Sequence, residues 1–138
     1  MTPYVANGVT TIFNLNANTE SFCQRKEIQS SRVIGPRMAL AALIDGGKGS
    51  GRNANTAEQG RQTVRNAKAE GYEFIKLYSK LNIESFTAIV DESGKQGLKT
   101  VGHIPAAFQG KLDQAFVPHF GMVAHADEFS KHAKDFNM

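Results

Sequence analysis

Residues 73–79, EFIKLYS, place a lysine in the middle of a segment that otherwise has the pattern of a buried β-strand. Because side chains alternate between the two faces of a strand, Lys76 is expected to share a face with Phe74 and Tyr78. An ammonium group is costly to keep on an apolar face. Burial lowers the pKa of a lysine, so the pattern predicts a neutral, nucleophilic amine at this position.

A structural role for Lys76 stays open at this stage. A strand lysine can extend its charged end to the rim of the sheet, where water solvates it, or pair with an acidic side chain. On the strand pattern alone, this is the more common role for such a residue. A chemical role therefore needs support from other residues.

Short apolar segments alternate with longer segments of helical period along the chain. This order is typical of βα units around a parallel sheet, so we predict an α/β fold. The predicted strands are residues 9–15, 38–44, 74–78, 99–103 and 122–125. The predicted helices are residues 19–30, residues 56–70, a helix from Ser79 or Asn82 to Gly94 or Gly97, and residues 108–116. Thr56 and Gln59 form a capping-box pattern at the start of the second helix.

The glycine-rich segment GGKGSGRNAN, residues 46–55, follows the second predicted strand. A phosphate-binding loop needs the pattern G-x-x-x-x-G-K-[ST] leading straight into a helix, so that backbone N–H groups face the phosphate. Lys48 does not fit that spacing, and the helix begins only at Thr56. We therefore predict a flexible loop rather than a phosphate cradle.

Three polar side chains occupy corresponding places in successive βα units. Lys76 lies on the third predicted strand, His103 ends the fourth and His125 ends the fifth. They are separated by 27 and 22 residues, each of which is the length of one βα repeat. Since parallel α/β folds place their sites at the carboxyl ends of the strands, we expect the three side chains to converge at one rim.

These three residue types can together hold a divalent metal. A neutral lysine amine can take up carbon dioxide and become a carbamate, an anionic group with two oxygen atoms that is suited to bridging two metal ions. Imidazoles from the next two strands would complete part of the ligand shell. The sequence thus predicts Lys76, His103 and His125 as ligands of zinc or another divalent metal. A single histidine at a strand end is more often a hydrogen-bonded structural residue.

Three other residues are weaker candidates for a functional role. Tyr78 lies two residues past Lys76 on the same face and is a candidate substrate contact, with plain packing as the alternative. His119 follows Pro118 in a predicted connection, and His132 lies in a polar terminal segment. Both histidines are expected on the surface. No residue of the chain is assigned a catalytic role beyond the metal ligands.

Five segments resemble, in this order, successive strand regions of the metal-dependent amidohydrolase superfamily: YVANGVTTIFNL, VIGPRMALAALIDGG, AEGYEFIKLYS, GLKTVGHIP and FGMVAHADEF. The most similar branch is the imidazolonepropionase-like and Xaa-Pro-dipeptidase-like one. The resemblance extends from about Tyr4 to Phe129. Each segment alone is a weak signal, whereas the ordered set is specific.

The resemblance implies a (β/α)8 TIM barrel that hydrolyses an amide or peptide-type bond through a water activated by one or two metal ions. Lys76 matches the carboxylated bridging lysine of that family, and His103 and His125 match its ligands on the fifth and sixth strands. The implied substrate is a small molecule or resembles a dipeptide.

By the same resemblance, residues 1–138 are expected to form a single partial barrel domain that holds strands two to six. The first strand, the last two strands and the β-sandwich of the family would be missing. The chain has no His-x-His pair, and the aspartate of the eighth strand would lie beyond Met138. We therefore expect the isolated chain to be an inactive fragment.

A partial barrel leaves two open sheet edges, at residues 9–15 and 122–125. Unpaired backbone donors and acceptors at such edges invite another strand. We expect association with a second copy or with a missing partner segment, or coverage by the terminal tails. A homo-oligomer is thus a possible state of this chain.

Charge and hydropathy exclude other classes of protein. The formal net charge of +3 is spread along the chain, without the basic stripe and interleaved aromatics of a nucleic-acid-binding protein. The longest apolar run, residues 38–44, is far shorter than the roughly 20 residues of a membrane-spanning helix. MTPYVANGVTT is not a secretory signal, so the default expectation is a cytoplasmic protein, although a longer parent could be exported.

Two other functions stay open from the sequence. The first is a non-catalytic βα interaction domain of the receiver type, which would need an acidic cluster after the first strand, where the chain has Asn14, Leu15 and Asn16. The second is a truncated product that keeps the appearance of the fold and binds nothing. A measurement of bound metal distinguishes these two functions from the hydrolase interpretation, because only the hydrolase interpretation predicts a bound metal ion.

Overall fold

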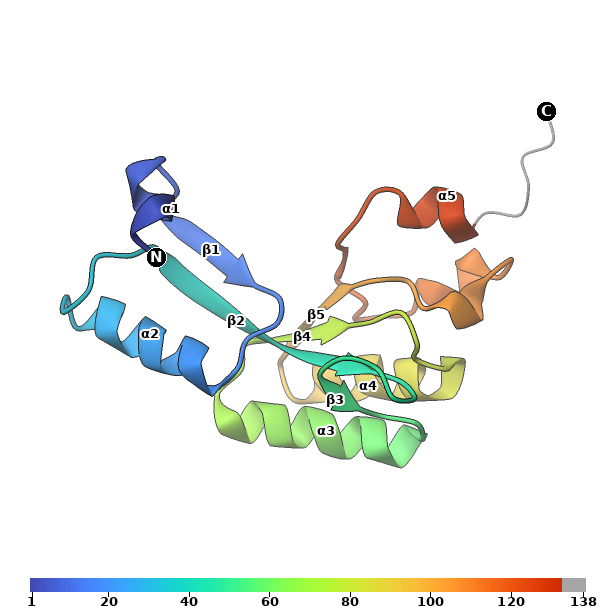
Figure 1. Cartoon of the computed structure of the whole chain (residues 1–138). Helices are drawn as coiled ribbons and strands as arrows, with labels where there is room; N and C mark the ends of the chain where they lie inside the picture. Colours follow the sequence, from blue (N-terminus) through green and yellow to red (C-terminus); the bar gives the residue numbers. More distant parts are fainter. Residues whose placement is uncertain (133–138) are drawn as a thin grey trace.

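The computed structural model describes residues 1–132, and Figure 1 shows how their helices and strands are arranged. The strands are β1 (Thr11–Asn14), β2 (Arg37–Asp45), β3 (Arg52–Asn53), β4 (Phe74–Leu77), β5 (Lys99–Gly102) and β6 (Met122–Val123). The helices are α1 (Thr2–Ala6), α2 (Thr19–Gln29), α3 (Ala57–Glu70), α4 (Ile83–Lys95) and α5 (Glu128–His132), with 3₁₀ turns η1 (Ala106–Phe108) and η2 (Leu112–Ala115). All five predicted strands form at their predicted places.

The strands build one parallel sheet in the order β1-β2-β4-β5-β6, and the short β3 pairs with the end of β2. The sheet curls, and α2, α3 and α4 lie together along its outer side (Figure 1). Each of these helices connects two parallel strands, as in a βα repeat. The fold is therefore half of a (β/α)8 barrel, as the sequence predicted.

The core lies between the sheet and the outer helices. Leu40 and Ile44 of β2 and Ile75 and Leu77 of β4 are fully buried on the helix-facing side, together with Phe86 of α4. Removing each such side chain from water contributes about 1.5–3 kcal/mol. Because these strand residues alternate with their neighbours, the residues between them face the concave side of the half barrel.

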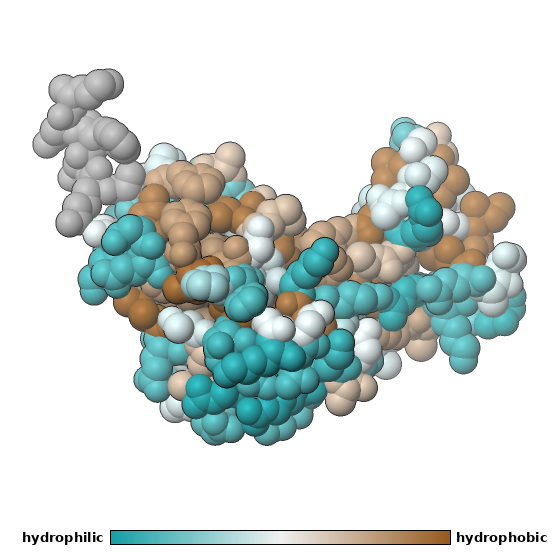
Figure 2. Space-filling model, turned by 180° about the vertical axis from the view of Figure 1, so that it is seen from behind, coloured by the Kyte–Doolittle hydropathy of each residue, from teal (hydrophilic) through white to brown (hydrophobic). Residues whose placement is uncertain are grey.

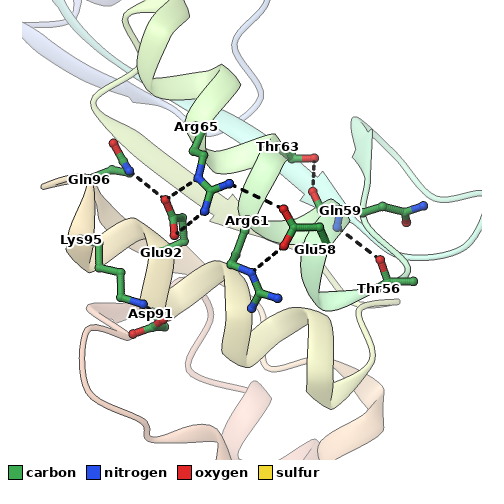
Figure 3. A network of polar contacts seen from close by, with 10 residues as sticks. All are labelled: Thr56, Glu58, Gln59, Arg61, Thr63, Arg65, Asp91, Glu92, Lys95 and Gln96. Atoms are coloured by element: carbon green, nitrogen blue, oxygen red, sulfur yellow. Dashed lines mark hydrogen bonds and ion pairs between the residues drawn. The ribbon is translucent and has the colours of Figure 1, made fainter.

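The two longest helices, α3 and α4, pack closely and are joined by ion pairs at their surface. Gly60 lets them approach, since a Cβ at that position would lie 2.9 Å from Ile89 Cγ1. Figure 3 shows Glu92 of α4 reaching Arg65 of α3, with 2.9 Å between Arg65 Nε and Glu92 Oε1. Gln96 Nε2 donates to the same oxygen at 2.8 Å. The outer layer is thus held by an apolar contact and a polar network.

The helix starts follow the predicted caps with one difference. Thr56 Oγ1 accepts a hydrogen bond from Gln59 N at 3.2 Å, but the Gln59 side chain accepts from Asn55 N instead of closing a capping box. Asn82, one of the two predicted caps, starts α4 through its side chain. The predicted end of this helix also agrees, because Gly97, with φ +67°, follows the C-cap residue Gln96 of α4.

The predicted helix over residues 108–116 was wrong. The segment holds only the last residue of the 3₁₀ turn η1 and the whole of η2, and Gly110 between them has φ +67°, which an α-helix cannot accommodate. The terminal helices α1 and α5 were not predicted. Within residues 1–132, every helix is too short or too polar to cross a membrane.

The surface divides by hydropathy. Figure 2 shows hydrophilic residues along the lower part of the molecule, where the helical layer lies, and hydrophobic residues above them. A hollow separates the two ends of the molecule in this view. The most exposed large apolar side chains near the end of the chain are Phe116, Met122 and Phe129, which are 52%, 51% and 44% exposed.

Candidate functional site

Lys76 lies in the middle of the sheet, on the concave side of β4. Its backbone is in register with Leu43 of β2 and Val101 of β5, and the residue is only 3% exposed. Burial lowers the pKa of Lys76, and the negative charge of Glu128 opposes this shift in part. The lysine is thus buried as the sequence predicted, and its neutral form is favoured relative to a lysine in water.

His103 follows β5 directly and is held in place from two sides. Its Nδ1 lies 2.8 Å from Glu128 Oε1. Its ring meets the ring of Tyr78 edge-on, with centroids 4.6 Å apart and an interplanar angle of 90°. The backbone N–H of His103 also donates to Leu77 O at 3.0 Å. The imidazole is therefore fixed at the rim, close to the end of β4.

His125 completes the group of predicted ligands. It lies two residues past β6, and its ring centroid is 4.7 Å from that of His103. Unlike His103, it is exposed to solvent. The two predicted imidazoles therefore lie side by side. Glu128 contacts His103, and its negative charge also acts on Lys76.

Tyr78 has a packing contact that the sequence did not specify. The residue is half-buried, and its ring supports the His103 imidazole rather than lying apart from it. This contact agrees with the packing alternative and leaves a substrate contact as a proposal.

Glu128 is the member of the site that the sequence interpretation missed. It is 4% exposed, at the start of α5, and comes three residues after His125 in HADEF. Burial raises the pKa of Glu128, but the hydrogen bond and charge of His103, with the charge of Lys131, outweigh it and leave the pKa below its usual value. The signal available in the sequence was that Glu128, an acidic residue, lies only three positions after the predicted ligand His125.

The surface assignment of His132 was wrong, whereas His119 is exposed as predicted. His132 is 5% exposed, and its Nδ1 lies 2.9 Å from Glu128 O. The polar sequence around His132 gave no sign that α5 buries this side chain together with that of Glu128.

The glycine-rich segment after β2 folds around a carboxylate of its own chain. Asp45 is 1% exposed, and its two oxygens accept hydrogen bonds from Gly46 N, Ser50 N and Lys80 N. Backbone N–H groups that would face a phosphate in a P-loop are therefore directed at Asp45, which supports the prediction that the segment is no phosphate cradle.

The donor set fits a divalent cation in part. Two adjacent imidazoles and a buried amine with a lowered pKa suit a zinc-type ion if the amine carries a carbamate. Among residues 1–132, no cluster of three or more His, Cys, Asp or Glu side chains could hold a metal ion by itself. Without a modified lysine, the described residues thus offer too few ligands for a closed site.

No family model and no curated protein matches the sequence. Solved structures match it. A bottromycin amidohydrolase has a TM-score of 0.71 and 21% sequence identity over 93% of this chain. A crystal structure of an uncharacterized protein has a TM-score of 0.64 and 16% identity over 80% of this chain. The likeness is one of fold.

The chain spans 32% of the length of the bottromycin amidohydrolase and 36% of the other protein. Its half barrel therefore corresponds to a part of a longer fold in both of these structures. This agrees with the partial barrel that the five strand segments led us to expect.

Proposed function

We propose that this chain forms part of the barrel of a metal-dependent amidohydrolase and that Lys76, His103 and His125 bind zinc or another divalent metal. The main support is the pair of imidazoles with ring centroids 4.7 Å apart after β5 and β6, together with a buried lysine on the adjacent strand β4. Parallel barrels carry their active sites at this end of the sheet. The fold likeness to an amidohydrolase is a second, independent support.

Lys76 would act in this site as a carbamate. Its neutral amine nitrogen attacks the carbon of carbon dioxide, an N–C bond forms, and the nitrogen releases one proton to solvent. The product is an anion with two oxygen ligands in place of a cation that would repel a metal. The lowered pKa of Lys76 favours the first step, because only the neutral amine has the free electron pair.

A bound divalent cation would supply Lewis-acid chemistry that activates water and polarises a carbonyl oxygen. The residues of this chain would hold the cation and orient its ligands. The proposed reaction is hydrolysis of an amide or peptide-type bond in a small or dipeptide-like molecule. Tyr78, whose ring lies against His103, is the proposed substrate contact.

The described residues supply only part of the ligand set that such a reaction needs. We therefore propose that this chain alone has no hydrolase activity and that further ligands and a proton acceptor come from additional polypeptide. Metal binding, rather than turnover, is the property by which to test the site.

The test is the zinc content of the metal-free protein after equilibration with zinc in bicarbonate buffer, measured by elemental analysis after gel filtration. We expect close to one zinc per chain. When the bicarbonate of the buffer is replaced by ¹³C-bicarbonate, the NMR spectrum of the wild type should show a carbamate carbon signal. This signal should be absent in Lys76→Ala.

His103→Ala and His125→Ala should each lose most of the bound zinc, because each removes one of few ligands. His119→Ala is the matched control, since His119 is an exposed histidine in the connection before β6. Equal zinc content in all four proteins, or no zinc in the wild type, would contradict the proposal and leave a non-catalytic βα domain as the better description.

A further inference from the structure

Glu128 makes a contact that the proposed metal site does not by itself require. Its Oε1 lies 2.8 Å from His103 Nδ1, whereas two other basic side chains approach the carboxylate only to 3.8 Å, through Lys131 Nζ and His132 Nδ1. Only the His103 contact has the length of a hydrogen bond. The carboxylate is therefore committed to one imidazole, although it lies between three basic side chains.

The direction of this hydrogen bond follows from the chemistry of the two groups. An ionised carboxylate has no proton to donate, so the proton must lie on His103 Nδ1. A glutamate carboxyl is ordinarily ionised near neutral pH, and the 2.8 Å separation of Oε1 and Nδ1 has the length of a hydrogen bond. In the neutral imidazole the second ring nitrogen, Nε2, then carries the free electron pair that a metal ligand needs.

The surroundings make this arrangement rigid. Glu128 is 4% exposed, and the His103 ring is packed against the rings of Tyr78 on one side and His125 on another. Water therefore competes little for the Nδ1 proton. Because Glu128, Tyr78 and His125 all contact the His103 ring, the ring cannot easily rotate to exchange the positions of Nδ1 and Nε2.

We propose that Glu128 is a positioning residue, which holds His103 as the Nδ1–H tautomer and leaves Nε2 free to bind the cation. This inference rests on the proposed function, since it assigns the cation to that site. It adds a residue that the strand pattern did not indicate. Carboxylates in this position raise the ligand strength of a histidine and fix its ring, and their loss costs about 10- to 100-fold in metal affinity.

Two variants whose side chains are similar in length to glutamate distinguish orientation of the His103 ring from packing against it. Glu128→Gln keeps an oxygen that can accept from Nδ1, whereas Glu128→Met fills the same space without an acceptor. The tautomer of His103 is read in the metal-free protein from ¹H–¹⁵N correlations of its ring. Zinc affinity is read separately by titration with zinc alone in bicarbonate buffer.

We expect wild type and Glu128→Gln to show the Nδ1–H tautomer, and Glu128→Met to shift toward the Nε2–H form. Glu128→Met should also bind zinc about 10- to 100-fold more weakly than wild type, with a smaller loss in Glu128→Gln. Glu92→Met is the control, because Glu92 is an equally buried glutamate that contacts Arg65 on the outer helices. It should change neither reading.

An unchanged tautomer in Glu128→Met would overturn the inference, whatever happens to zinc affinity. If wild type binds no zinc, the proposed function fails, and the tautomer measured without metal still decides whether Glu128 orients His103. The two failures are therefore distinguishable. Circular dichroism of each variant confirms that the fold is retained before the readings are compared.

Discussion

Asp45 Oδ1 accepts a hydrogen bond from Lys80 N at 2.8 Å and thereby ties the loop after β2 to the loop after β4. The same oxygen accepts from Gly46 N at 2.9 Å, and Oδ2 accepts from Ser50 N at 3.1 Å. The side chain is almost fully buried. One carboxylate therefore fixes two of the loops that border the candidate site.

Asp45→Ala should lower the free energy of unfolding by about 2–3 kcal/mol, because it leaves one buried and two partly buried backbone donors without their acceptor. Asp45→Asn keeps one acceptor oxygen and should lose less. Urea denaturation followed by circular dichroism measures both. Asp113→Ala, at an exposed aspartate of η2, is the control and should stay close to wild type. Equal effects at both positions would contradict this role of Asp45.

Gly102 precedes His103 at the end of β5 and has no room for a side chain. Its φ is +154°, and a Cβ there would overlap Leu77 O on the neighbouring strand. Gly97 also has a positive φ, of +67°, but nothing lies within 4 Å of its would-be Cβ. Substitutions at these two glycines therefore distinguish the cost of a positive φ alone from the added cost of a steric collision.

Gly97→Ala should cost about 1–2 kcal/mol, which is the strain of a left-handed residue. Gly102→Ala should cost at least twice as much, because strand β4 must move away from β5. Since His103 is the next residue, Gly102→Ala should also weaken zinc binding, whereas Gly97→Ala should not. Thermal unfolding and zinc titration give the two readings. A Gly102→Ala protein as stable as Gly97→Ala would show that β4 and β5 can separate without penalty.

Glu92 provides a pH-dependent test away from the candidate site. The hydrogen bond from Arg65 holds the pKa of Glu92 below its usual value of 4.5, against the effect of burial, with help from Gln96. The folded state therefore binds fewer protons than the unfolded state at acid pH. The stabilisation from Glu92 is fully present above about pH 4.5 and is lost as the pH falls through the lower value of the folded state.

Glu92→Gln should reduce stability at pH 7, and its difference from wild type should shrink as the pH falls below about 4.5. Urea midpoints between pH 3 and pH 7 measure this difference. Glu58→Gln is the control, because Glu58 contacts Arg61 and Arg65 while its side chain is 68% exposed. Its effect should be smaller at every pH. A constant difference between wild type and Glu92→Gln across this range would contradict the interpretation.

The sequence predicted those parts of the fold that depend on local pattern. A continuous apolar run located β2, and the apolar neighbours of Lys76 located β4. Thr56 marked the start of α3 and Asn82 was one of two predicted starts of α4, since each side chain acts on the backbone three residues away. The burial of Lys76 also followed from its strand neighbours. The spacing of one βα repeat placed His103 and His125 together at the rim.

What the sequence did not predict depends on contacts between distant segments. Glu128 becomes part of the site only because α5 folds back until its first residue reaches His103, 25 residues earlier in the chain. The same packing buries His132, although its neighbours in sequence are polar. Residues 108–116 have a helical composition, but the backbone of Gly110 divides them. The periodicity of the local sequence does not reveal these contacts between distant segments.

The two ends of the sheet bear on the state of association. β1 and β6 are the terminal strands of the sheet order, so each has one side without a strand partner among residues 1–132. Beside β6 the rings of Phe116 and Phe129 stack with centroids 6.1 Å apart, and Met122 on the strand itself is half exposed. An open strand edge next to exposed apolar side chains favours pairing with another chain.

We propose that two copies of this chain associate through the β6 edge, and expect a mass above the 15.0 kDa of one chain in light scattering, increasing with concentration. Met122→Lys should shift the equilibrium toward the monomer, because a lysine on an edge strand opposes pairing with a second one. Ile34→Lys is the control, since Ile34 is 73% exposed in the connection before β2 and should leave association unchanged. A mass of 15.0 kDa at every concentration would exclude the pairing and show that these edges remain single in solution.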